Sequence, residues 1–166
     1  MFRTATIVAH DPGLRVGGRV LTARVRVPDE NFAPGPWSSR FHVIDYDSST
    51  HTMYRPREGR DLLFDGEVSD AVILGDPRFH ACNAFVVATR TLEQFQRALG
   101  RRLSWAFPGH QLKIVPHAFR DANAFFSEEL EALLFGYFPG SSGDVFTCLS
   151  HDIIVHETTH ALLEGL

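Results

Sequence analysis

The stretch HDIIVHETTHALLEGL at positions 151–166 decides how this chain is interpreted. It contains His156-Glu157-Thr158-Thr159-His160, which matches the pattern H-E-x-x-H. Apolar residues stand on both sides of the motif, as they do in a helix that packs against a core. We therefore expect residues 144–166 to form one element that enters a helix near Ser150 or Asp152. We also expect that helix to be largely buried.

The spacing of the two histidines has a geometric consequence. Positions i and i+4 lie on one helix face about 6 Å apart along the axis, so the imidazoles of His156 and His160 can converge on one ion. Zinc takes neutral imidazole nitrogens, and a catalytic zinc site keeps one tetrahedral position for water. Glu157 lies beside the pair, where it can accept a proton from that water. The motif predicts a Zn²⁺ site with His156 and His160 as ligands and Glu157 as the catalytic base.

The alternative is that His156, Glu157 and His160 are core side chains whose polar atoms are satisfied by hydrogen bonds. Burying these three side chains with neither a metal nor hydrogen-bond partners would be costly. The spacing does not identify a third zinc ligand. The extended pattern H-E-x-x-H-x-x-G-x-x-H fails, because Leu163 and Leu166 stand where Gly and His are required. Glu164 lies about 12 Å along a straight helix from His156, too far to share one ion. We therefore expect the third ligand beyond Leu166 and interpret the chain as one lobe of a larger enzyme.

Composition limits the remaining possibilities. The chain has 166 residues, of which 44% are apolar and 22% charged, as in a globular domain with one core. A net charge of -4 with scattered Lys and Arg argues against nucleic-acid binding. No apolar run is long enough for a membrane helix or a secretory signal, so we expect a cytoplasmic protein. Cys82 and Cys148 stand in no metal-ligand spacing, and we expect two reduced, buried thiols.

The pattern of the whole chain predicts an α+β fold. We expect a mostly antiparallel, β-rich region over residues 1–75 and a second region over 76–166, together forming one compact unit. Strands are expected at 20–27 and 112–115, with a hairpin of 41–46 and 50–54. Residues 34–36 and 139–143 indicate loops, and two apolar runs within 62–74 are compatible with strands. The apolar run 131–138 fits either a helix or a strand.

A long helix is expected between Asp76 and Gly100. Asp76 can cap its start, Pro77 suits its first turn, and Gly100 suits its exit. Apolar residues recur between them at steps of three and four, which predicts one apolar face. We interpret this segment as a core helix without chemistry of its own.

The second half of the chain resembles the thermolysin-like gluzincin metallopeptidases. The resemblance depends on Asn123-Ala124-Phe125, a short apolar segment, a Gly-rich loop and LSHDIIVHETTH at 149–160, in that order. The first seventy-odd residues show no matching motif. The resemblance implies a zincin-like N-terminal lobe in which His156 and His160 bind zinc and Glu157 is the general base. The third ligand, a downstream Glu, and the oxyanion-stabilising residues of a C-terminal helical lobe would lie outside this chain.

The resemblance also implies a peptide or protein substrate. Asn123 and Ala124 would lie on the rim, where an extended peptide pairs with an edge strand, so residues 132–138 are expected to be that strand. A turn residue that bonds its own backbone is an equally good explanation for Asn123. Asp152 matches a position that holds calcium in some members, and a helix N-cap explains it equally well.

Three functions are compatible with these observations. The first is a zinc-dependent metallopeptidase-like hydrolase, although members of this family typically carry an export signal, which is not seen here. The second is a non-catalytic binding or assembly module derived from such a lobe. The third is a metal hydrolase that acts on a substrate other than peptides. For the 166-residue chain itself we expect weak zinc binding, little peptidase activity, and self-association through apolar surface that a second lobe would cover.

Overall fold

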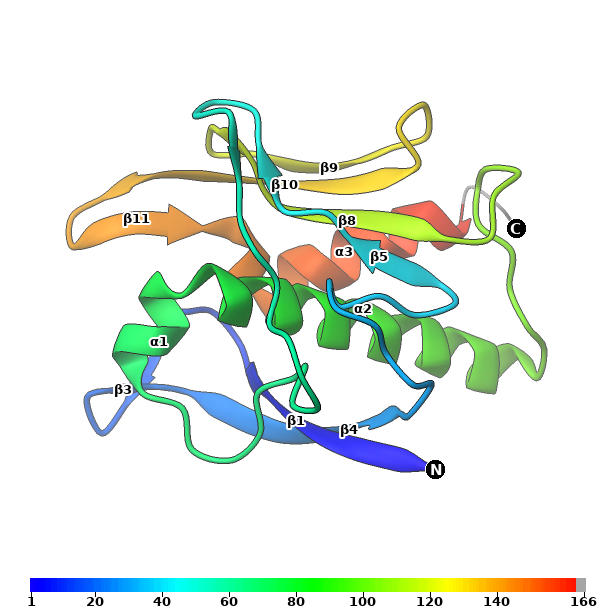
Figure 1. The fold of residues 1–166 in the computed structure, drawn as a ribbon, viewed down its shortest axis with the longest axis horizontal. Coiled ribbons are helices and arrows are strands. Elements are labelled where there is room, and N and C mark those ends of the chain that lie inside the picture. Colours follow the sequence, from blue (N-terminus) through cyan, green and yellow to red (C-terminus); the bar gives the residue numbers. More distant parts are fainter. Residues whose placement is uncertain (164–166) are drawn as a thin grey trace.

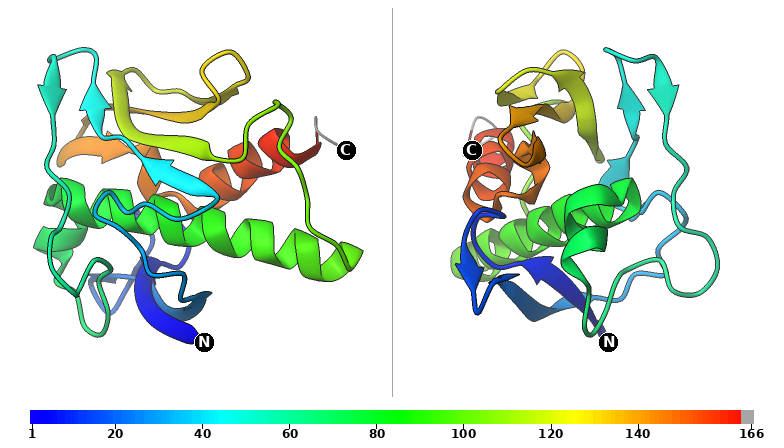
Figure 2. Two further views of the ribbon diagram at one scale, coloured as in Figure 1. Left: turned by 45° about the vertical axis from the view of Figure 1, so that its right-hand side comes forward. Right: turned by 90° about the vertical axis from the view of Figure 1, so that its left-hand side faces the viewer.

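A computed structural model of the chain describes residues 1–163 and shows an α+β fold (Figure 1). Helix α2 (Pro77–Leu99) runs through the middle of the molecule. A mixed sheet lies on one side of it, and the antiparallel ribbon of β1 (Phe2–Val8) and β4 (Thr22–Pro28) lies on the other. Figure 2 shows the same order of layers after rotation. Helix α3 (His151–Leu163) packs against α2 and against strand β9.

The mixed sheet has five strands in the order β11-β10-β8-β5, with β9 also paired to β10. Strand β8 (Leu112–Arg120) pairs in parallel with β5 (Phe41–Val43) and with β10 (Ala132–Gly140). Strands β9 (Ala124–Ser127) and β11 (Gly143–Phe146) run antiparallel to β10, one after the other along the same side.

This pairing corrects one prediction from the sequence. Residues 132–138 form a strand, but not an edge strand, because β10 has neighbours on both sides. Within residues 1–163, β9 pairs with β10 alone and has a free outer edge. The apolar run fits β10 because consecutive residues such as Ala132 and Leu133, which point to opposite faces of the sheet, are both buried, and a strand covered on both faces has a continuously hydrophobic sequence.

The long helix α2 begins and ends as predicted. The Asp76 side chain accepts a hydrogen bond from the Arg78 N–H, Pro77 is the first helical residue, and Gly100 takes the left-handed conformation with φ of 67°. The prediction of one apolar face is wrong for the first half, because every residue from 79 to 88 is buried. This part of α2 is surrounded by the ribbon, the sheet and α3. It therefore carries His80 and Asn83 into the core.

The strands of the first 75 residues are shorter and more divided than predicted. The alternating stretch 20–27 lies mostly in β4, while Val20 belongs to β3 (Arg19–Val20), which pairs with β2 (Arg15–Val16). The predicted hairpin is reduced to β6 (Tyr46–Asp47) and β7 (Thr52–Met53). Its expected first half is split, because β5 leaves the hairpin to join the mixed sheet.

The apolar runs within residues 62–74 form no strand. Leu62 and Leu63 are buried in irregular structure, and the second run lies in helix α1 (Asp70–Gly75), which Ser69 caps. Residues from both sides of position 75 contribute to one hydrophobic core. Both cysteines are free and buried, as expected.

The segment before α3 also differs from its prediction. Residues 139–143 form a tight hairpin rather than an open loop, with Gly140 paired to Gly143. Residues 144–163 form part of β11, the 3-10 turn η1 (Thr147–Leu149) and then α3, so they are three elements rather than one. The helix itself begins at His151, between Ser150 and Asp152, as predicted. Within residues 1–163, no helix has both the length and the apolar character needed to cross a bilayer.

Candidate metal centre

The apolar residues of α3 determine which way its motif faces. Ile154, Thr158, Ala161 and Leu162 are buried, and they lie on one face of the helix. At 3.6 residues per turn, His156 and His160 lie roughly 150–180° around the helix from the centre of this face. Both histidines are therefore exposed, and the prediction of a largely buried motif is wrong for its metal-binding face.

The two imidazoles converge at their outer nitrogens. The Nε2 atom of His160 lies 3.0 Å from the Nε2 atom of His156, and the ring centroids are 4.7 Å apart. Two nitrogens bound at about 2.05 Å in tetrahedral geometry would lie about 3.3 Å apart. The pair fits a zinc ion after opening by a few tenths of an ångström. The expected juxtaposition of His156 and His160 is therefore present.

Glu157 turns from the histidines towards the sheet. Its Oε2 atom accepts a hydrogen bond of 3.2 Å from the backbone N–H of Phe126, in the middle of β9. Because this N–H bonds to α3 instead of β10, it faces the outer edge of the strand. The carboxylate of Glu157 thus lies between the motif helix and the free strand edge.

The start of β9 is held by a backbone contact at Gly136. The Gly136 N–H donates to the Asn123 carbonyl at 2.8 Å, next to the irregularity in register between Leu134 and Gly136. The Asn123 side chain accepts a hydrogen bond of 2.9 Å from the Ala124 N–H, which is the local contact expected of a turn residue. Asn123 is exposed and Ala124 is partly buried at the rim of β9. Their role in peptide binding stays a prediction.

A shallow hollow of about 410 Å³ lies along the outer face of α3, bounded by Asp152, His156, Thr159, His160 and two apolar residues. Asp152 is exposed in the first turn of α3, where a carboxylate is favoured by the helix dipole. Among residues 1–163, no third His, Cys, Asp or Glu joins His156 and His160 in a potential ligand group, and none joins Asp152. Glu164 and Leu166 lie outside the described residues, and calcium binding at Asp152 stays a prediction.

A second group of side chains that could hold a metal ion lies in the core, and no motif spacing in the sequence points to it. His80, His117 and Cys148 are buried, and their potential ligand atoms lie within 4.8 Å of one another. His80 Nδ1 lies 2.8 Å from His117 Nε2, and His117 Nδ1 lies 2.7 Å from a carboxylate oxygen of Asp45. No two of these residues stand at a motif spacing, so only the fold reveals them.

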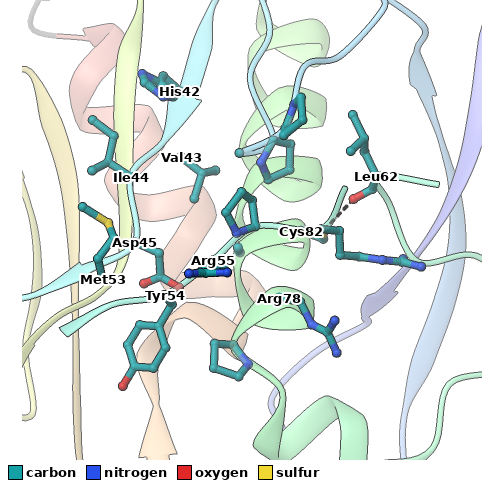
Figure 3. A pocket seen from close by; sticks show the side chains of 17 residues that line it. His42, Val43, Ile44, Asp45, Met53, Tyr54, Arg55, Leu62, Arg78 and Cys82 are labelled. Atoms are coloured by element: carbon teal, nitrogen blue, oxygen red, sulfur yellow. Dashed lines mark hydrogen bonds between the residues drawn. The ribbon is translucent and has the colours of Figure 1, made fainter. Parts of the chain in front are cut away.

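A cavity of about 390 Å³ is lined by Asp45, the carboxylate that contacts His117 (Figure 3). Its walls come from the segments around β5 and β7 and from the first turns of α2. Asp45 lines the cavity, as does Cys82, whose thiol donates a hydrogen bond to the Leu62 carbonyl (Figure 3).

Burial changes the acid–base properties of these side chains. Desolvation, helped by the charge of His117, lowers the pKa of His80 to about 3. Desolvation also raises the pKa of the Cys82 thiol to about 12 and holds that of Cys148 well above its usual value. Neither thiol is therefore a ready nucleophile.

No protein-family model, no curated protein and no solved structure matches this chain.

Proposed function

We propose that this chain carries part of the active site of a zinc-dependent peptidase. His156 and His160 would be two zinc ligands, Glu157 the general base, and β9 the strand on which an extended substrate lies. One observation carries the proposal: the two Nε2 atoms converge at 3.0 Å on an exposed helix face. The H-E-x-x-H pattern and the position of Glu157 at a free strand edge support it.

Zinc bound here would supply Lewis acidity towards a carbonyl and a water that is acidic near neutral pH. The imidazoles suit this role because their Nε2 atoms face solvent and need no rearrangement of the core. Since residues 1–163 offer no third ligand beside them, the proposal requires a carboxylate or imidazole from outside these residues.

Glu157 would transfer the proton. Its Oε2 atom accepts a hydrogen bond from the Phe126 N–H, which holds the carboxylate between the motif helix and the edge of β9. The other carboxylate oxygen can accept a proton from the attacking water and deliver it to the leaving amine. Replacement by Gln would keep the contact with β9 and remove the base.

The edge of β9 suits an extended peptide. In an antiparallel pair, residues two apart point their backbone groups to the same side. Because the Phe126 N–H faces outward, the carbonyls of Ala124 and Phe126 also face the free edge. A peptide strand could donate its N–H groups to these carbonyls, and its scissile bond would then pass near Glu157.

Zinc content after dialysis tests the metal site. We expect the parent chain to bind one equivalent of zinc weakly at this histidine pair. His156→Ala and His160→Ala should each lose that equivalent. Glu157→Gln should retain it, and His110→Ala, which removes another exposed histidine, serves as the matched control. Equal zinc content in the parent and in His156→Ala would reject the assignment.

Peptide hydrolysis tests the reaction. We expect little turnover by the 166-residue chain. A longer form that adds a downstream carboxylate or histidine should cleave peptides, and Glu157→Gln should abolish this activity while zinc stays bound. Zinc binding without turnover in such a form would favour the alternative, a binding or assembly module.

A further inference from the structure

We propose that His80, His117 and Cys148 form a second, buried binding site for a divalent ion of the Zn²⁺ class. The three side chains come from α2, β8 and η1, and their exposed fractions are 1%, 2% and 0%. Two imidazoles and a thiolate are a common ligand set for zinc. The site is separate from the exposed histidine pair and does not depend on the proposed peptidase function.

The outer nitrogens of both imidazoles are held as in known metal sites. His80 Nε2 lies 2.8 Å from the Ile73 carbonyl oxygen, and His117 Nδ1 lies 2.7 Å from Asp45 Oδ1. A metal-binding histidine typically donates its remote N–H to a carbonyl or a carboxylate, which orients the ring. These contacts leave His80 Nδ1 and His117 Nε2 facing each other across 2.8 Å.

The hydrogen bonds define where the protons lie without a metal. The Ile73 carbonyl can only accept, so His80 carries its proton on Nε2 and presents a bare Nδ1 when neutral. His117 must then donate through Nε2 to His80. One further proton lies between His117 Nδ1 and Asp45, so these two side chains together carry no net charge.

This arrangement makes a divalent ion the fitting ligand. Binding would form bonds to His80 Nδ1, His117 Nε2 and Cys148 Sγ, and it would release one proton from His117 Nε2 and one from the Cys148 thiol to solvent. Before binding, the cations and anions of the buried group cancel. Afterwards, the two positive charges of the ion cancel the Cys148 thiolate and the Asp45 carboxylate. A monovalent ion would leave one buried negative charge without a partner, which is costly.

The required movement is small. Two tetrahedral zinc-bound nitrogens lie about 3.3 Å apart, so the rings need to separate by roughly 0.5 Å. Three protein ligands leave the fourth position for a water molecule. The Phe146 ring lies against both imidazoles, with centroid distances of 4.4 and 5.4 Å, and shields them from bulk solvent. Asp45, which contacts His117, also lines the cavity of Figure 3, whereas the three ligand residues do not line it. Because all three ligands are buried, we expect slow entry and slow release of the metal.

Cobalt absorption spectroscopy tests the site, because only a thiolate ligand gives a strong sulfur-to-cobalt charge-transfer band. Refolding with Co²⁺ should produce the band in the parent chain, and Zn²⁺ should displace it. Cys148→Ala should lose the band, while Cys82→Ala, which removes the other buried thiol, should keep it. The double variant His156→Ala/His160→Ala should also keep it, which separates this site from the candidate peptidase site.

The proton count gives a second measurement. Calorimetric titration in two buffers of different ionisation enthalpy measures how many protons are released when the ion binds. At neutral pH we expect two protons per ion bound at the buried site. The titration is done on the double variant His156→Ala/His160→Ala, so that the exposed histidine pair does not contribute. Absence of a charge-transfer band in folded parent chain would overturn the proposal. A charge-transfer band that persists in Cys148→Ala would also overturn the proposal, as would the release of fewer than two protons.

Discussion

Replacing Gly136 by Ala should weaken the strand edge on which the proposed substrate lies. A Cβ atom at this position would lie 2.6 Å from the Asn123 carbonyl oxygen, and it would also press on the carbonyl of Asp121. Both obstacles are backbone atoms, which cannot rotate away as a flexible side chain can. Gly136 is required here by the close approach of the turn at residues 121–123, between β8 and β9.

The cost can be worked from these contacts. Real Cβ atoms essentially never approach another heavy atom within 3.0 Å, so the segment at Asn123 must retreat by at least 0.4 Å. This movement stretches the 2.8 Å hydrogen bond from the Gly136 N–H to the Asn123 carbonyl. Overpacking costs about 1–3 kcal/mol and a weakened hydrogen bond about 0.5–1.5 kcal/mol. We expect the free energy of unfolding to fall by about 2–4 kcal/mol.

Urea unfolding followed by tryptophan fluorescence measures this loss, and hydrogen exchange locates it. Amides of β9 should exchange faster in Gly136→Ala, while those in the middle of α2 should change least. Gly75→Ala is the matched control, because nothing lies within 4 Å of the added Cβ and the residue ends a helix. It should be neutral or slightly stabilising. Equal unfolding midpoints for both variants would refute the reasoning.

Three further outcomes are expected. Tyr137→Phe removes a hydrogen bond to Asp47 and should cost about 2 kcal/mol at neutral pH in urea unfolding. Burial alone would raise the pKa of Asp47, but hydrogen bonds from Tyr137 and two backbone N–H groups lower this pKa below 3.8. The stability that these hydrogen bonds provide is therefore lost as the pH falls through the folded-state pKa of Asp47. The variant should therefore approach the parent in acid; an undiminished difference there would contradict this. Cys82 and Cys148 should resist a thiol reagent in the folded protein and react fully in denaturant, and rapid native labelling would contradict their burial. Light scattering should show self-association at high concentration, because apolar side chains such as Phe125 are exposed beside the candidate site, whereas a monomer at every concentration would count against it.

Local signals in the sequence were sufficient where the structure depends on local chemistry. The ends of α2 follow from Asp76 as N-cap, Pro77 in the first turn and Gly100 in the left-handed region. The juxtaposition of His156 and His160 follows from helical spacing alone. Each of these features involves residues within one element.

Features that depend on pairing between distant segments cannot be predicted from local sequence signals. Hydrophobic periodicity cannot tell whether a strand such as β10 has one neighbour or two, so the edge was assigned to the wrong strand. The direction of the motif helix was also missed, because exposure depends on what covers it. His80 and His117 are 37 positions apart and meet only through the packing of α2 against β8.

Gly136 connects the two halves of the candidate site. Its N–H holds the turn at Asn123 that starts β9, and its carbonyl accepts a hydrogen bond of 2.7 Å from the Thr147 hydroxyl in η1. Since η1 leads directly into α3, the substrate edge and the motif helix are attached to one point on β10. A shift of β10 at this point would move the Phe126 N–H and the Glu157 carboxylate together. We therefore expect Gly136 to maintain the spacing between the proposed base and the proposed substrate strand through its contacts with Asn123 and Thr147.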